Sequence, residues 1–164
     1  MFRFLTQWFR NEVVVGDCFM SKNLVTQRQW KKVFGTEPWK SWGPYSNFCN
    51  TYAPVQPLII GDNCPAFSLN WDDAVAFCKK LSEMEGRTYR LPTCEEIKLG
   101  KEAVRQAYHI WEFSGDVKEE DFGYRYVMCP SGVRHVTVSN EISARDERSR
   151  HRWFGFRLVR TPTP

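Results

Sequence analysis

The sequence lacks the apolar runs that mark secretion and membrane insertion. Arg3, Gln7 and Arg10 interrupt the first ten residues, so the apolar core of a secretory signal does not form there. No stretch approaches the roughly 20 apolar residues of a membrane-spanning helix. We therefore expect no signal peptide and no membrane span, with synthesis in the cytoplasm and either retention there or export as part of a virion-like particle.

The sequence also lacks the spacing of common metal and catalytic motifs. Its six cysteines form no Cys-x-x-Cys pair and its three histidines stand apart, which excludes zinc-ribbon and thioredoxin motifs. No glycine-rich phosphate loop is present. Cys49 and Cys64 flank a proline-rich loop, but without a secretion signal we expect no disulfide between them. We predict no catalytic residue, no metal and no cofactor.

The net positive charge of the chain is small and is concentrated near the C-terminal end. The formal net charge is +4, and residues 143–164 hold six arginines against two acidic residues. This surplus suits an acidic ligand or nucleic acid, but it also suits a plain solvated loop, because charge alone confers little specificity. We do not expect nucleic acid as a partner.

What the sequence does contain is enough apolar material for one core. Its 164 residues are 42% hydrophobic and 15% aromatic, with seven tryptophans. This length and composition predict a single globular domain over residues 1–164.

The clearest local pattern covers residues 68–93. Asn70 is a good helix N-cap, and Gly86 supplies a left-handed C-terminal stop. The residues between them repeat at helical spacing and form one apolar face: Ala74, Phe77, Cys78, Leu81 and Met84. A short strand is expected over 87–91, and Thr93 with Glu96 forms a capping box for a further helix that runs to about Gln106.

The remaining elements are short. Thr26 and Gly35 bound a helix that ends at Phe34. Strands are predicted at 12–15, 124–128, 133–138 and 154–159. Short strands that follow helices predict an α+β fold.

A long loop over 36–65 is rich in proline and in aromatic residues. The aromatic residues are Trp39, Trp42, Tyr45, Phe48 and Tyr52. We favour the interpretation that they pin the loop to the body of the protein. The alternative is an aromatic surface for a ligand.

Several of these motifs resemble the formylglycine-generating enzyme/sulfatase-modifying factor family. The Ser68-Leu-Asn-Trp-Asp-Asp-Ala74 helix start and the Tyr89-Arg-Leu-Pro-Thr93 strand are similar to its motifs, as are Leu24–Trp30, Trp111-Glu-Phe113 and Gly155–Arg160. The pieces come in the family's order from about Phe19 to Arg160. The resemblance implies a compact C-type-lectin-like fold with a small twisted antiparallel sheet, two to three helices and long irregular loops.

The resemblance also implies an activity that the residues do not support. Catalytic members of the family bind copper through two nearby cysteines and oxidise a substrate cysteine, as suits soft thiolate ligands. Between Val138 and Gly155 this chain has no cysteine. There is likewise no room for the added helical domain that supplies histidines to iron in the related sulfoxide synthases.

The segment that holds calcium in the family is also replaced here. An acidic stretch nearby offers either a new oxygen site or, as we favour, a solvated acidic turn: Glu112, Asp116, Glu119, Glu120 and Asp121.

The segment 139–153 is the candidate recognition site. It is almost wholly polar, lies between two predicted strands and ends in a tryptophan, and arginine with tryptophan is common at binding hot spots. The residues that we assign to ligand binding are Ser139, Asn140, Arg145, Asp146, Arg148, Arg150, His151 and Trp153. The same region resembles the variable segment of proteins diversified by retroelements in phages and bacteria.

We therefore expect a non-catalytic module that binds a protein or glycan through 139–153. The expected setting is a homo-oligomer or a larger assembly. A trimmed oxidase of the formylglycine-generating type and a purely structural subunit remain as alternatives.

Overall fold

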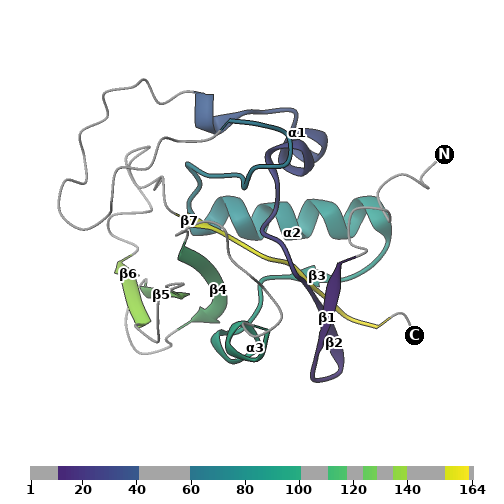
Figure 1. Cartoon of the computed structure of the whole chain (residues 1–164), viewed down its shortest axis with the longest axis vertical. Helices are drawn as coiled ribbons and strands as arrows, with labels where there is room; N and C mark the ends of the chain where they lie inside the picture. Colours follow the sequence, from purple (N-terminus) through teal and green to yellow (C-terminus); the bar gives the residue numbers. More distant parts are fainter. Residues whose placement is uncertain are drawn as a thin grey trace.

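The computed structural model describes residues 11–40, 60–100, 111–117, 124–128, 135–139 and 154–162. Figure 1 shows the long helix α2 (Trp71–Glu85) running across the middle of the molecule, with one small sheet below each of its two ends. The helix α1 (Gln27–Phe34) lies above α2, and α3 (Cys94–Leu99) lies below it. These three helices and two sheets form the scaffold that positions the candidate site.

The central helix α2 begins and ends where local chemistry predicts. The Asn70 side chain accepts from the Asp73 N–H at 2.8 Å, and the Asp73 side chain accepts from the Asn70 N–H at 3.1 Å. Gly86 ends the helix with a φ of 64°, a conformation that glycine adopts without a steric cost. Its predicted apolar face is buried apart from Met84, which is partly buried.

The predictions for α1 are confirmed as well. Thr26 and Gln29 form a reciprocal capping box, and Gly35 closes the helix. Trp30 stacks on Phe77 of α2 with the ring centroids 5.5 Å apart. Phe156 meets both rings edge-on. This aromatic cluster joins the two helices to the C-terminal segment at the centre of the core.

The helix α3 is shorter than predicted. The Thr93–Glu96 capping box is present, but the helix ends at Leu99 and does not extend to about Gln106 as expected. Gly100 follows it, and a Cβ built there would lie 2.0 Å from Cε of the buried Met20. A side chain at this position would therefore require the buried terminal methyl of Met20 to move.

The first sheet has the strand order β1-β2-β8-β3 and is antiparallel throughout. Its strands are β1 (Glu12–Val15), β2 (Cys18–Ser21), β3 (Tyr89–Arg90) and β8 (Val159–Arg160). The strand predicted at 87–91 is therefore reduced to two residues.

The second sheet has the order β6-β5-β4-β7. Its strands are β4 (Trp111–Val117), β5 (Tyr124–Met128), β6 (His135–Ser139) and β7 (Phe154–Gly155). The β4–β7 pairing is parallel, whereas the others are antiparallel. The strand predicted at 133–138 extends to Ser139, and residues 133–134 lie outside the described ranges. The strand predicted at 154–159 is divided, because 156–158 cross from one sheet to the other (Figure 1).

Candidate functional site

The scaffold holds both ends of the candidate segment on one sheet. Ser139 is the last residue of β6 and pairs with Tyr124, while Phe154 is the first residue of β7 and pairs with Trp111. β6 and β7 are the two outer strands, so three strand spacings, about 14 Å in all, separate them. The register also puts Ser139 and Phe154 at opposite ends of the strands. Residues 140–153 therefore connect diagonally opposite corners of the sheet.

The C-terminal corner is fixed by aromatic packing. Phe154 is buried and stacks on Phe113 of β4, with the ring centroids 5.1 Å apart and the rings inclined by 15°. Gly155 pairs with Glu112 in the parallel ladder. The position of the segment's exit is thus determined by the core.

A buried ion pair lies immediately beyond this corner. Arg157 Nε donates to Glu112 Oε2 at 2.6 Å, and the two side chains are 1% and 2% exposed. The two terminal nitrogens of Arg157 have no hydrogen-bond partner in the described part of the chain. Glu112 is therefore neither part of a solvated acidic turn nor free to bind calcium, and both expectations for it were wrong.

The sequence did contain a signal for this pair. Glu112 is the lone acid between two aromatic residues, and Arg157 is the lone base between Phe156 and Leu158. A single charge inside an apolar strand implies a partner, because an unpaired buried charge is very costly. The identity of the partner became evident only when β4 and the segment that follows β7 were placed side by side.

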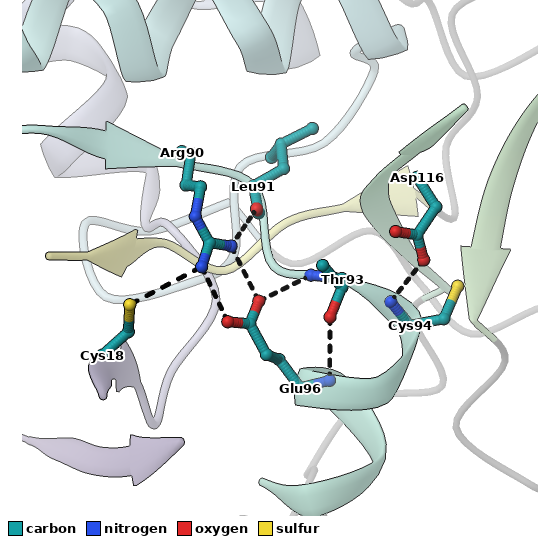
Figure 2. A network of polar contacts seen from close by, with 7 residues as sticks. All are labelled: Cys18, Arg90, Leu91, Thr93, Cys94, Glu96 and Asp116. Atoms are coloured by element: carbon teal, nitrogen blue, oxygen red, sulfur yellow. Dashed lines mark hydrogen bonds and ion pairs between the residues drawn. The ribbon is translucent and has the colours of Figure 1, made fainter. Parts of the chain in front are cut away.

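A network of polar contacts connects β4 to the start of α3 (Figure 2). Asp116 Oδ2 accepts from the Cys94 N–H at 2.7 Å, and Cys94 Sγ lies 3.3 Å from Ser114 Oγ. Asp116 thus belongs to β4 and supports the N-terminus of α3, where a negative charge is favourable. Asp116 is therefore not part of a solvated acidic turn, and Glu119, Glu120 and Asp121 lie outside the described residues.

The second half of this network joins β3 to the same helix. Arg90 contacts both carboxylate oxygens of Glu96, each at 2.7 Å, and the Thr93 N–H donates to Glu96 Oε2 at 2.8 Å (Figure 2). Burial opposes the charge of Glu96, but the hydrogen bonds from Arg90 and Thr93 outweigh it and lower the pKa of Glu96. Cys18 Sγ lies 3.7 Å from the Arg90 guanidinium.

Among the described residues, the cysteines form neither a disulfide nor a three-residue metal site. Cys18, Cys64, Cys78 and Cys94 are all free, while Cys49 and Cys129 lie outside the described residues. Burial raises the pKa of Cys78 to about 12, as expected of a core residue. Within the described ranges, His, Cys, Asp and Glu side chains nowhere form a group of three suited to a metal ion.

Of the five aromatic residues named in the 36–65 loop, the structure describes Trp39. Trp39 follows α1 in a short 3-10 helix (Pro38–Lys40), is 2% exposed and packs beside Phe67. Its burial supports the interpretation that Trp39 pins the loop to the core. The other four aromatic residues of the loop lie outside the described residues.

The structure describes only one of the predicted ligand-binding residues. Ser139 ends β6, where only its backbone placement is described. The others lie outside the described residues: Asn140, Arg145, Asp146, Arg148, Arg150, His151 and Trp153. The structure thus places the two ends of the candidate segment but not the predicted binding side chains.

Comparisons with known proteins place this scaffold in a wider group. Residues 9–121 match the FGE-sulfatase family, a sulfatase-modifying factor enzyme 1-like domain. The chain is similar to Treponema denticola variable protein 1, with 15% identity, a TM-score of 0.55 and coverage of 88% of this chain and 84% of that chain. It is also similar to PvdO from Pseudomonas aeruginosa, with 14% identity, a TM-score of 0.58 and coverage of 88% and 80%. No curated protein sequence matches.

Structural similarity at these identities establishes the fold alone. It confirms the predicted α+β class and the C-type-lectin-like architecture. Among the described helices, none combines the length and hydropathy that crossing a bilayer requires.

Proposed function

Because the chain belongs to the family of sulfatase-modifying factor enzyme 1-like domains, we propose that it uses the family scaffold for recognition and not for catalysis. In this proposal residues 139–153 bind a protein or glycan ligand. Arginines 145, 148 and 150 supply planar donors, and Trp153 supplies an apolar anchor.

The observation that carries the proposal is the placement of the segment's ends. Ser139 and Phe154 lie at opposite corners of a sheet whose central strand β4 is held by Phe113, Ser114 and Asp116. A polar segment held at both ends by a rigid sheet is well suited to present a recognition surface.

A more specific form of the proposal is a variable-type surface. One protein with the same fold carries the name variable protein, which supports a role for 139–153 as a segment diversified between copies. A retroelement-linked bacterial or phage recognition protein, carried on a virion, is the form that we propose.

The copper chemistry of the family does not fit the residues present. The chain has no cysteine between Val138 and Gly155. Among the described thiols, Cys78 is buried with a raised pKa, and Cys94 contacts the Ser114 hydroxyl. Cu(I) prefers two exposed, easily ionised thiolates, so we derive no oxidation step for this chain.

A comparison of variants tests the proposal. We would screen glycan and surface-protein arrays with the wild type, an Arg148→Ala/Arg150→Ala/Trp153→Ala variant and a Lys79→Ala/Lys98→Ala control that removes exposed positive charge elsewhere. We expect the control to bind as the wild type does and the triple variant to lose at least tenfold in affinity while keeping its circular dichroism spectrum.

Two results would contradict the proposal. Equal binding by all three proteins would place recognition outside 139–153. Binding to no array member, together with oligomers that disappear when the 36–52 loop is altered, would favour the structural-subunit alternative.

A further inference from the structure

A second surface, beside the first sheet and α1, has the features of a ligand site. A cavity of about 190 Å³ lies between the start of β1, the connection from β2 to α1 and the turn before Cys64. Three asparagines from these three separate segments line it: Asn11, Asn23 and Asn63. All three are exposed, and none of their carboxamides has a hydrogen-bond partner among the described residues.

The backbone donors beside the cavity are already used. The first three N–H groups of α1 donate within the protein: Gln27 to Cys64 O at 2.8 Å, Arg28 to Asp62 O at 3.1 Å and Gln29 to Thr26 Oγ1 at 3.3 Å. A helix N-terminus binds an anion through such donors when they are free. Here they are not free, so the helix offers an anion no direct hydrogen bond.

Among the described lining residues, the one cation is paired with an acid. The Arg28 guanidinium contacts Asp62 Oδ2 at 2.8 Å. The residues that line the cavity in the described part of the chain include no acid to attract a cation. The groups that remain available for a ligand are therefore neutral carboxamides, with Leu24 and Val25 as apolar neighbours.

The chemistry of these groups defines a ligand class. A carboxamide offers both an acceptor oxygen and an NH₂ donor, which matches hydroxyl groups that also donate and accept. The cavity is smaller than the roughly 300–1,000 Å³ of drug-sized sites, so it suits one small unit. We propose that this cavity binds a single neutral sugar unit through the carboxamides of Asn11, Asn23 and Asn63.

The cavity lies beside other elements than the two strands that bound the recognition segment. Its lining residues lie beside β1, between β2 and α1, in α1 and before Cys64, whereas 139–153 begins and ends at strands of the second sheet. Figure 1 shows the two sheets near opposite ends of α2. Among the described contacts, Asn23 and Asn11 act through their backbone: Asn23 O accepts from Ser21 Oγ, and Asn11 O accepts from the Lys22 N–H. Side-chain substitutions therefore leave these contacts intact.

Nuclear magnetic resonance of the ¹⁵N-labelled full chain tests the proposal. We would titrate glucose, galactose, mannose and N-acetylglucosamine and follow the side-chain NH₂ signals of Asn23 and Asn63. We expect saturable shifts with at least one neutral sugar. Asn23→Ala/Asn63→Ala should weaken that binding at least tenfold, whereas Arg148→Ala/Arg150→Ala/Trp153→Ala and Lys79→Ala should leave it unchanged.

Other outcomes overturn the proposal and identify the error. Equal shifts with N-acetylneuraminate would show that the site takes anions. Shifts with N-methylacetamide but not with sugars would indicate peptide backbone as the ligand. No shift with any of these compounds would mean that the cavity binds no sugar. If Asn23→Ala/Asn63→Ala misfolds, we would test Asn63→Asp in its place. Aspartate keeps the shape of the asparagine side chain and removes its NH₂ donor.

Discussion

Arg157 and Glu112 form an ion pair of 2.6 Å between side chains that are 1% and 2% exposed. Glu112 belongs to β4, at the centre of the second sheet, and Arg157 lies in the segment that crosses to the first sheet. The pair therefore connects the two sheets at the point where the C-terminal end of the candidate segment enters the core.

Breaking this pair on one side should be costly. We expect Arg157→Met to lower the free energy of unfolding by about 3–5 kcal/mol, because it leaves the Glu112 carboxylate buried without its cation. Urea unfolding monitored by tryptophan fluorescence measures this. Adding Glu112→Leu to Arg157→Met should recover part of the loss. The exposed pair Arg28–Asp62 is the matched control, and Arg28→Met should cost less than about 1 kcal/mol. An equal loss of unfolding free energy in Arg157→Met and Arg28→Met would contradict the prediction.

Glu96 should make stability depend on pH. Its pKa is lowered in the folded protein, so its charge stabilises the fold above the unfolded-state pKa of about 4.3 and this contribution is lost as the pH falls through the folded-state value. Glu96→Gln keeps a side-chain acceptor for the Thr93 N–H but loses the charge opposite Arg90. We expect it to cost about 1–2 kcal/mol near neutral pH.

Thermal unfolding at several pH values checks this dependence. The difference between wild type and Glu96→Gln should shrink as the pH falls below about 4. A difference that stays constant over that range would show that the charge of Glu96 is not responsible.

The thiols should differ in reactivity. Cys78 is buried and its pKa is raised to about 12, and burial also raises the pKa of Cys94. Because the thiolate is the reactive form, iodoacetamide should label the partly exposed Cys18 and Cys64 well before Cys78 and Cys94. Mass spectrometry of timed digests reads each site. Labelling of Cys78 as fast as in the urea-unfolded chain would contradict its burial.

Gly100 should be intolerant of a side chain. Alanine favours helices over glycine by about 1 kcal/mol, but a Cβ at Gly100 would lie 2.0 Å from Met20 Cε, and overpacking typically costs 1–3 kcal/mol. We expect Gly100→Ala to destabilise the wild type but to be neutral or stabilising in a Met20→Ala background. Urea unfolding of the wild type, Gly100→Ala, Met20→Ala and the double variant measures the four free energies of unfolding that this double-mutant comparison needs. The same loss in both backgrounds would exclude the steric explanation.

The sequence by itself determined where the three helices begin and where α1 and α2 end. The caps at Thr26, Asn70 and Thr93 and the stops at Gly35 and Gly86 depend on contacts within a few residues, so local chemistry sufficed to place them. The family motifs likewise predicted the C-type-lectin-like class. For the candidate site, the sequence identified the polar segment 139–153, and its binding role stays a prediction.

Only the tertiary structure decided how distant strands meet. Residues 154–159 divide between two sheets because Gly155 pairs with β4 whereas Val159 pairs with β2 and β3. Glu112 and Asp116 both seemed to belong to one acidic stretch, yet Glu112 pairs with Arg157 and Asp116 supports α3. Partners of this kind lie tens of residues away along the chain. Their identity follows from strand order and register, which local sequence patterns do not determine.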